Sequence, residues 1–323
     1  MAVLVTGAAG FIGYHVAEAL LARGHAVIGV DNLNDYYEVS LKQARLVRLE
    51  GKNGFTFRKL DFANRDSMAA LAAEFPGITH IVHLGAQPGV RYSLINPYAY
   101  VTSNVMGQVT VLETARMLKK LCNVVYASSS SVYGGNQKMP FAVGDAVETP
   151  QSLYAATKRA DELISHSYAH LYGMPLVGLR FFTVYGPWGR PDMAPMIFAR
   201  AILAGEPIRV FNNGEMWRDF TYIDDIVAGV LAAMDAPPAG KPPHKLYNLG
   251  NNRCEKLTDF IAALESALGK KAQMRFEPMQ PGDVEKTYAD IEATRRDLGF
   301  EPTTPISTGV PKFVAWYREY YRA

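Results

Sequence analysis

The chain has 323 residues, of which 49% are hydrophobic and 20% are charged, and its formal net charge at pH 7 is +2. This length and composition suit a globular protein with one large core or two modest ones, and the small net charge excludes a long-range field that would select nucleic acid or an anionic membrane. The two cysteines, Cys122 and Cys254, belong to no CxxC or Cys/His cluster, so neither a disulfide scaffold nor a metal site is expected.

The first residues lack a basic start followed by a sustained apolar stretch, and no window approaches the roughly 20 apolar residues that a membrane span needs. We therefore expect a cytoplasmic protein that makes no membrane contact and binds no nucleic acid.

Short apolar runs alternate with amphipathic stretches through the first half of the chain. Parallel strands are buried on both faces, whereas the helices that connect them are buried on one, so this alternation predicts an α/β fold with a doubly wound parallel sheet. The strands are expected at 2–7, 26–31, 80–86, 123–130 and 175–182, and the clearest helices at 14–23 and 105–119.

The first expected strand runs directly into a turn that contains Gly7, Gly10 and Gly13. Glycines permit a tight turn, and they let backbone N–H groups and the start of the next helix approach a pyrophosphate closely. Because the motif lies at the first strand-to-helix junction, it predicts a dinucleotide site of the Rossmann type, with Phe11 and Ile12 in the same turn.

The second expected strand ends at Asp31, about twenty residues past the glycine turn, where a carboxylate can accept hydrogen bonds from the adenosine ribose hydroxyls. NAD is expected rather than NADP, because the carboxylate repels a 2′-phosphate and no arginine follows it immediately. The alternative is an aspartate that merely ends a strand.

A run of hydroxyl side chains, Ser128 to Ser131, follows the strand expected at 123–130. Ligands of open parallel sheets bind at the carboxyl ends of the strands, so these hydroxyls are expected beside the site. One of them could pass a hydrogen bond between a substrate hydroxyl and a catalytic base; a polar turn is the alternative.

Tyr154 and Lys158 stand four residues apart in a segment with helical periodicity, so both side chains project from one helix face. An ammonium beside a phenol stabilises the phenolate, which lets the tyrosine act as a base nearer neutral pH. Such a pair alone is common on solvated helices, but after the glycine turn and the serine run it predicts a catalytic site.

After about Tyr185 the pattern changes, with Gly and Pro interrupting shorter elements. Strands are expected at 207–211 and 245–250, and helices near 225–234 and 257–268. We expect an NAD-binding domain at 1–185 and a smaller α/β substrate-binding domain at 186–323, between which strands and helices can be exchanged.

With these motifs, the whole chain resembles the nucleotide-sugar branch of the extended short-chain dehydrogenases. The segments 31–37, 89–93 and 180–194 are similar to those of UDP-glucuronate 4-epimerases in particular. Dehydrating and decarboxylating relatives carry acidic residues near the catalytic hydroxyl, whereas Ser130 and Ser131 stand there in this sequence.

The resemblance implies further site residues. It places the catalytic hydroxyl at Ser129, with Ser128, Ser130 and Ser131 as alternatives, and the nicotinamide ribose near His83 to Ala86. The cofactor contacts that it implies are Asn32, Asp61, Phe62, Leu84 and Ala86, and the substrate contacts are Ser128, Ser129, Ser130, Thr183, Arg190, Arg218, Gln280 and Asp283.

The resemblance also implies that the enzyme inverts C4 of a UDP-sugar by transient oxidation with tightly bound NAD, and that it forms a homodimer through a four-helix interface. A UDP-glucose or UDP-N-acetylglucosamine 4-epimerase shares the same catalytic residues and is the nearest alternative. A sensor that binds NAD without turnover is a further one, although such proteins commonly lose the Tyr/Lys pair.

Overall fold

The computed structural model describes residues 1–280 and 284–323. Its central sheet contains β1 (Ala2–Thr6), β2 (Ala26–Asp31), β3 (Phe55–Lys59), β4 (Ile78–His83), β5 (Asn123–Ser129), β6 (Leu176–Phe181) and β11 (His244–Leu249). The strands are all parallel and follow the order β11-β6-β5-β4-β1-β2-β3. Every residue of β6 is buried, as parallel strands covered on both faces require. The expected doubly wound α/β fold is confirmed.

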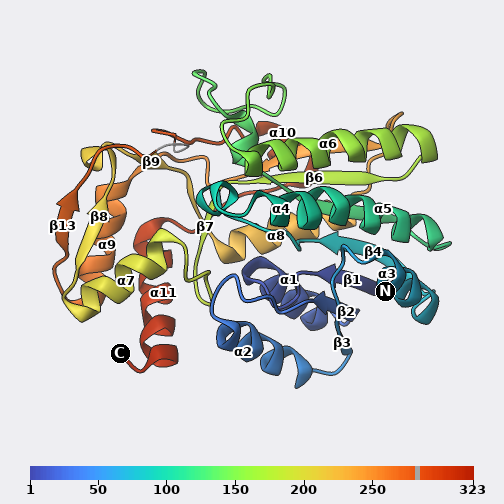
Figure 1. Cartoon of the computed structure of the whole chain (residues 1–323), viewed down its shortest axis with the longest axis horizontal. Helices are drawn as coiled ribbons and strands as arrows, with labels where there is room; N and C mark the ends of the chain where they lie inside the picture. The colour runs from blue at the N-terminus through green and yellow to red at the C-terminus, as the bar shows by residue number, and fades with distance from the viewer. Residues whose placement is uncertain (281–283) are drawn as a thin grey trace.

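Helices cover both faces of this sheet (Figure 1). One face carries α1 (Phe11–Ala22), α2 (Val39–Glu50) and α8 (Ile223–Asp235), and the other carries α3 (Arg65–Glu74), α5 (Gly107–Met117) and α6 (Leu153–Tyr172). Side chains alternate across the sheet, so that Val3 and Val5 of β1 join the core on the α1 side while Leu4 joins the core on the α5 side.

The path from β4 to α5 is helical for longer than the sequence indicates. It passes through the 3₁₀ turn η1 (Arg91–Leu94), α4 (Pro97–Tyr100) and the π-helix η2 (Val101–Met106). The helix expected at 105–119 therefore starts earlier, because the Asn96 side chain accepts a hydrogen bond from Ala99 N at 3.3 Å and Pro97 occupies the first helical position. After β5, the 3₁₀ turn η3 (Ser130–Tyr133) carries the serine run.

A second region lies at the left of Figure 1 and ends at the C-terminus. Its described elements are α7 (Ala194–Ala204), β8 (Pro207–Val210), the 3₁₀ turn η4 (Asn212–Gly214), β9 (Trp217–Arg218), β12 (Glu255–Lys256), α9 (Leu257–Leu268), β13 (Gln273–Phe276) and α11 (Ile306–Tyr321). Helix α10 (Glu292–Leu298) lies apart from them and packs against β11 and α8. Strands β13 and β8 pair, as do β12 and β9, while β7 (Thr183–Tyr185) and β10 (Phe220–Tyr222) form a third pair where the chain leaves the main sheet.

The two regions exchange elements. Strand β11 pairs with β6 along its whole length, so the strand expected at 245–250 belongs to the main sheet, although it lies beyond residue 185. Helix α8 likewise packs against α1 and β5. The division at residue 185 remains a prediction; β11, α8 and α10 all follow it in the sequence but pack with the main sheet.

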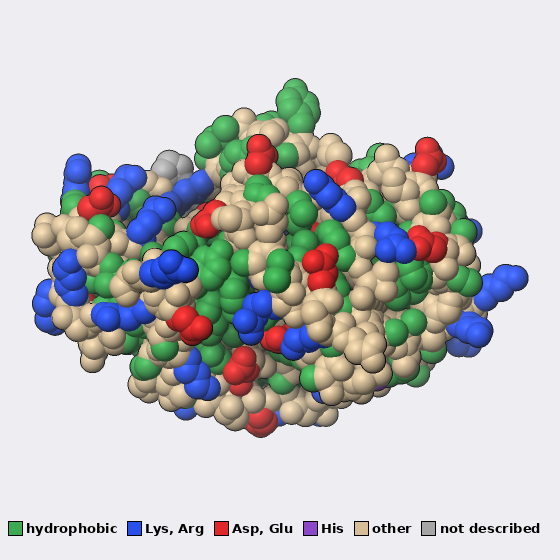
Figure 2. All heavy atoms as spheres, turned by 90° about the horizontal axis from the view of Figure 1, so that it is seen from below, with side chains coloured by type: hydrophobic (Ala, Val, Ile, Leu, Met, Phe, Trp, Pro, Cys, Tyr) green, Lys and Arg blue, Asp and Glu red, His purple; other side chains and the backbone are tan. Residues whose placement is uncertain are grey.

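Basic and acidic side chains are interspersed over much of the face drawn in Figure 2, with hydrophobic side chains in the hollow between the two regions. Among the residues that the structure describes, no helix combines the length and apolar composition that crossing a membrane requires.

Candidate active site

A cavity of about 420 Å³ opens at the carboxyl ends of the strands and is lined from both regions. It brings together most of the residues predicted from the sequence. These are Gly7, Gly10, Phe11, Ile12, Gly13, Asp31, Asn32, Phe62, Leu84, Ala86, Ser128, Ser129, Ser130, Tyr154, Lys158, Thr183, Arg190 and Arg218. Asp61 and Gln280 are not among its lining residues, and Asp283 lies outside the residues that the structure describes.

The glycine turn leaves no room for side chains. Gly7 has φ +70°, and a Cβ there would lie 2.8 Å from the backbone nitrogen of Gly85; a Cβ at Gly13 would lie 2.0 Å from the carbonyl oxygen of Gly7. Helix α1 starts directly after Gly10 with no side-chain cap and no acidic residue in its first turn. Its first N–H groups therefore remain available to an anion such as a pyrophosphate.

Asp31 is held rigidly at the end of β2. Its side chain is 8% exposed, and its two oxygens accept hydrogen bonds from Ala9 N at 3.1 Å and Leu33 N at 2.9 Å. Burial raises the pKa of this carboxyl group, and the two backbone N–H groups oppose that shift. Each oxygen keeps a further lone pair for a ribose hydroxyl.

Phe62 forms a wall of the cavity by packing between two glycines. A Cβ at Gly85 would lie 2.5 Å from the Phe62 ring, and a Cβ at Gly107 would lie 2.4 Å from it. Asp61 stands behind this wall, where its carboxylate accepts from Ala63 N at 2.9 Å and Asn32 Nδ2 at 3.4 Å. Asp61 is thus linked by a hydrogen bond to Asn32, which lines the cavity.

The shape of the cofactor side depends on Arg45 of α2, which no motif in the sequence indicates. Its fully buried guanidinium donates to the carbonyl oxygen of Ala9 at 2.8 Å and to those of Trp188 and Gly189 at 2.6 and 3.2 Å. One side chain therefore joins the glycine turn to the loop that leads to Arg190.

Tyr154 and Lys158 both line the cavity from the start of α6. The Ser152 hydroxyl caps this helix by accepting from Ala155 N at 3.1 Å, and the Tyr154 ring packs edge-on against Tyr100 with centroids 6.1 Å apart. The Lys158 ammonium donates to the Ala127 carbonyl at 3.0 Å and to Asp161 Oδ2 at 3.1 Å. This geometry fixes the ammonium on the same helix face as the phenol.

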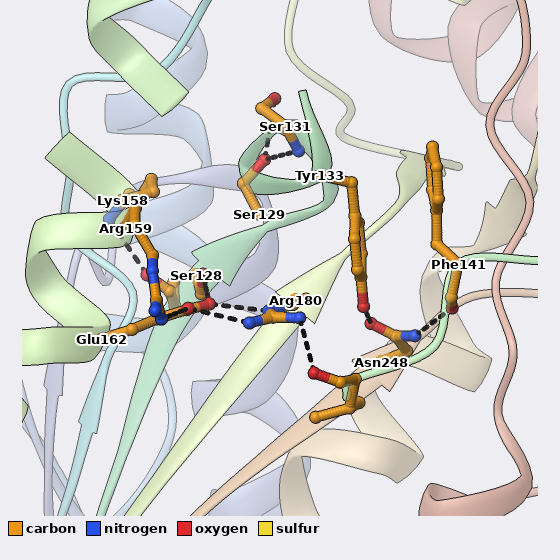
Figure 3. Close-up of polar contacts among 12 residues, drawn as sticks. Ser128, Ser129, Ser131, Tyr133, Phe141, Lys158, Arg159, Glu162, Arg180 and Asn248 are labelled. Atoms are coloured by element: carbon orange, nitrogen blue, oxygen red, sulfur yellow. Dashed lines mark hydrogen bonds and ion pairs between the residues drawn. The ribbon is translucent and has the colours of Figure 1, made fainter. Parts of the chain in front are cut away.

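The serine run divides into two environments (Figure 3). The Ser128 hydroxyl donates to Glu162 Oε1 at 2.7 Å, so it is engaged inside the protein. Ser129 instead faces the turn η3, where its Oγ lies 3.1 Å from Ser131 Oγ and accepts from Ser131 N at 3.2 Å. Ser131, which the sequence analysis named only as an alternative catalytic hydroxyl, also lines the cavity.

A buried ion pair lies beneath this turn. Arg180 and Glu162 are each 1% exposed and are joined by hydrogen bonds of 2.7 and 2.9 Å (Figure 3). Burial alone favours neutral Glu162, but the hydrogen bonds and charge of Arg180 outweigh it and leave the pKa of Glu162 below its usual value. The pair therefore holds Ser128, and with it the strand end, in place.

The network continues across the chain through Tyr133. The Arg180 guanidinium lies 4.9 Å from the centroid of the Tyr133 ring, whose hydroxyl donates to Asn248 Oδ1 at 2.6 Å. The Asn248 amide nitrogen donates to the carbonyl oxygens of Phe141 and Asp290 at 2.8 and 2.9 Å. Segments far apart in the sequence are thus fixed around the serine turn.

Arg190 and Arg218 enter the cavity from the second region. Arg190 forms a two-point ion pair with Asp192, at 3.0 and 2.6 Å, and Asp192 also accepts from the Tyr36 hydroxyl at 3.1 Å. Burial and the nearby Asp192 raise the pKa of Tyr36 to about 12, so this phenol stays a donor. Arg218 donates to the carbonyl oxygens of Trp217 and Glu285.

Several residues that line the cavity were not predicted from the sequence. Lys42, 5% exposed, donates to Asn34 from the helix after β2, and Tyr36 closes the cavity beside Asp192. Tyr36 lies inside the segment 31–37 that carried the family resemblance, which was the one available signal; Lys42 had none. The described residues form no group of three or more His, Cys, Asp or Glu side chains that could hold a metal ion.

The arrangement fits a dinucleotide. An uncapped helix start after a tight glycine turn, a fixed carboxylate at the end of β2 and an aromatic wall lie along one cavity that leads to Tyr154 and Lys158. The second part of the cavity, with neutral hydroxyls and two arginines, suits a sugar nucleotide.

Comparison with known proteins agrees with this geometry. A model of the NAD dependent epimerase/dehydratase family matches residues 3–250. UDP-glucuronate 4-epimerase 4 of Arabidopsis thaliana is 48% identical over 99% of this chain and 76% of its own length. Protein CapI of Staphylococcus aureus is 48% identical over the full length of both chains.

The fold agrees with solved structures as well. The UDP-glucuronic acid 4-epimerase of Bacillus cereus, solved in complex with UDP-glucuronic acid and NAD, matches with a TM-score of 0.92 and 35% identity, covering 99% of this chain and 100% of that one. The glycine turn, the Tyr154/Lys158 helix and these matches lead to one conclusion: the chain belongs to the NAD-dependent epimerase/dehydratase family.

Proposed function

We propose that this protein interconverts UDP-glucuronic acid and UDP-galacturonic acid by inverting C4 of the sugar, with NAD as a bound cofactor. One observation carries the proposal: Tyr154 and Lys158 share a cavity with Ser129, Ser131 and Thr183, so the groups beside the catalytic pair are hydroxyls. The names of the Arabidopsis thaliana and Bacillus cereus relatives support the same substrate.

Elimination chemistry lacks its groups at this position. The dehydrating and decarboxylating enzymes that this chain resembles carry an acidic residue near the catalytic hydroxyl, whereas positions 130 and 131 here are both serines. Simple oxidation at C4 followed by reduction from the opposite side needs only a group that takes and returns the hydroxyl proton. Tyr154 supplies that group.

The roles of the catalytic residues follow from their geometry. Tyr154 accepts the proton of the C4 hydroxyl, and the Lys158 ammonium, fixed on the same helix face, stabilises the phenolate. Ser129 bridges the sugar hydroxyl and Tyr154. When bound, NAD supplies the two-electron oxidation and reduction at C4.

The substrate must stay attached while its ring turns over. Arg190 and Arg218 lie in the cavity where they can hold the diphosphate, and a guanidinium that shares two N–H groups with Asp192 still has three for phosphate oxygens. The sugar carboxylate would meet Ser129, Ser130, Ser131 and Thr183, whose neutral hydrogen bonds are weak enough to be exchanged as the ring turns. We place Gln280 and Asp283 at the uridine end by resemblance alone.

We further propose a homodimer built on the face of α4, η2, α5 and α6. Large apolar side chains on this face are exposed although monomeric proteins rarely expose contiguous apolar surface. They are Tyr98, Val101, Met106, Met117, Leu163, Leu171 and Tyr172, with exposed fractions of 48% to 80%. Light scattering on the purified protein tests this proposal, and a monomeric mass would contradict it.

The function is tested by incubating the purified protein separately with UDP-glucuronic acid, UDP-glucose and UDP-N-acetylglucosamine, without added NAD, and identifying the products by NMR. We expect UDP-galacturonic acid from the first substrate and little conversion of the other two. Conversion of UDP-glucose or UDP-N-acetylglucosamine in preference would assign the alternative specificity. Absence of any product, with NAD present in the purified protein, would favour a binding protein without turnover.

A further inference from the structure

Asp161 is a buried carboxylate that the proposed reaction does not use. It follows Lys158 by one helical turn on α6, it is 1% exposed, and its Oδ2 lies 3.1 Å from the Lys158 ammonium, which is 3% exposed. Its other oxygen, Oδ1, is buried without a hydrogen-bond partner. A buried carboxylate that is only half satisfied is costly, so its presence calls for a reason.

The next residue on the same helix gives the contrast. Glu162 receives hydrogen bonds from Ser128, Arg159 and Arg180, so both of its oxygens are satisfied and its place in the fold is explained by packing. Asp161 has one partner, the Lys158 ammonium. Burial raises the pKa of Asp161 to about 6 and Lys158 opposes the shift, so the carboxylate is mostly ionised at neutral pH.

The charge of the neighbouring Glu162 also raises the pKa of Asp161. Burial lowers the pKa of His83 to about 3 and raises that of Tyr126 well above its usual value, so both are neutral in the working range. Arg180 is neutralised by Glu162. The titratable or charged groups of the elements packed against α6 are Arg91, Tyr92, Tyr98, Tyr100, Glu113, Arg116, Tyr126, Tyr133, Arg180, His244, Lys245 and Tyr247.

The hydrogen bonds of the Lys158 ammonium show how Asp161 orients it. Of its three N–H bonds, one goes to the Ala127 carbonyl and one to Asp161, which leaves one for a ligand in the cavity that Lys158 lines. Asp161 therefore aims the ammonium as well as balancing its charge.

We propose that Asp161 is the counter-ion of Lys158, a positioning residue that balances the charge of the buried ammonium and orients it, and so sets the pH range in which the enzyme is active. This inference rests on the proposed function, because it concerns the same catalytic pair.

The decisive variant is Asp161→Asn, which keeps the shape and one acceptor oxygen but removes the negative charge. Without that charge the site holds its protons less tightly, so the acid limb of the kcat profile moves to lower pH. The alkaline limb moves in the same direction. A shift of about one pH unit is expected, the low end of the effect of a charge about 4–6 Å away.

The matched control is Glu18→Gln, which also replaces a carboxylate by its amide. Glu18 lies on α1, pairs with Lys52 at 2.8 Å and is not among the residues that line the cavity. Its pH limbs should coincide with those of the wild type. If Asp161→Asn lowers kcat while both limbs stay in place, Asp161 is merely structural and the proposal is overturned; movement of both limbs to lower pH supports it.

A second measurement needs no variant at Asp161 and no turnover. The ¹⁵N resonance of the Lys158 ammonium in the wild-type protein, assigned with Lys158→Met, should show a step near pH 6 as Asp161 ionises. A curve that stays flat over the whole acidic range in which the protein remains folded would overturn the counter-ion role. If the wild type fails to convert UDP-glucuronic acid but shows the step, the proposed function has failed while the counter-ion pair stands.

Discussion

The two halves of the cavity are built by different means. On the cofactor side, apart from the Arg45 side chain, local backbone sets the shape: Gly7, Gly10 and Gly13 form the turn within one short segment, and Asp31 is fixed by two backbone N–H groups. On the sugar side, side chains reach across the sequence, as Arg180 does to Glu162 and Asn248 does to Phe141 and Asp290. Damage to the first half should stay local, whereas damage to the second should spread.

The largest effect is expected from Tyr154→Phe, which removes the proposed proton acceptor but leaves the cofactor side and the sugar side of the cavity unchanged. Loss of the phenolic hydroxyl removes the proton acceptor, so kcat should fall by about 10²- to 10⁴-fold while the protein still retains NAD. The measurement is turnover of UDP-glucuronic acid together with the NAD released on denaturation. Tyr320→Phe on α11 makes the same change outside the cavity lining and should leave kcat unaltered. Substantial activity in Tyr154→Phe would remove this residue as the base.

Arg180→Met tests whether damage to the sugar half spreads. It leaves Glu162 charged and buried without its main partner, which costs about 3–5 kcal/mol of unfolding free energy. Urea unfolding measures this loss. Arg58→Met breaks an exposed pair with Glu74 instead, and its stability should be indistinguishable from that of the wild type. Equal behaviour of the two variants would mean that the buried network does not stabilise the fold.

Thr183→Ala sharpens the comparison within the sugar half. A 4-keto uronic acid is prone to lose CO₂, and we hypothesise that hydroxyl contacts hold the carboxylate where its C–C bond overlaps poorly with the keto group. Removing one contact should raise the decarboxylated pentose fraction by about two- to tenfold, the factor that a hydrogen bond of about 0.5–1.5 kcal/mol represents. NMR of the products measures it, with the exposed Thr102→Ala as control. An unchanged product ratio would remove the hypothesis.

The smallest effect is expected from Tyr36→Phe, at the contact between the cofactor side and the sugar side of the cavity. Tyr36 belongs to the cofactor side, and its hydroxyl donates to Asp192, which holds Arg190 of the sugar side. Without this partly exposed contact, Arg190 is less well fixed, so KM for UDP-glucuronic acid should rise by about two- to fivefold with kcat nearly unchanged. A fall in kcat with constant KM would show that Tyr36 affects the chemical step instead.

The same contrast explains what the sequence could predict. The glycine turn, the end of β2 and the Tyr154/Lys158 spacing are encoded within short segments, so local pattern and chemistry were enough. Helix α2 is not among the helices that the sequence predicts, because its buried face includes Lys42 and Arg45, whose burial depends on partners elsewhere. No local pattern reveals such partners.

Long-range pairing limited the rest. The segment that forms β11 was expected in the smaller domain, since nothing in its sequence states that its partner is β6, some seventy residues earlier along the chain. The half-satisfied state of Asp161 was equally invisible, because an i, i+3 neighbour of Lys158 on a helix reads as an ordinary surface pair until burial is known.

Arg45 has a consequence for how the protein uses its cofactor. Because its guanidinium ties the glycine turn to the loop before Arg190, opening either wall requires breaking hydrogen bonds to the other. We therefore expect the protein to bind NAD once, near the time it folds, and to retain it through many reaction cycles. Its output would then follow the supply of sugar nucleotide and be insulated from swings in the redox balance of the cell.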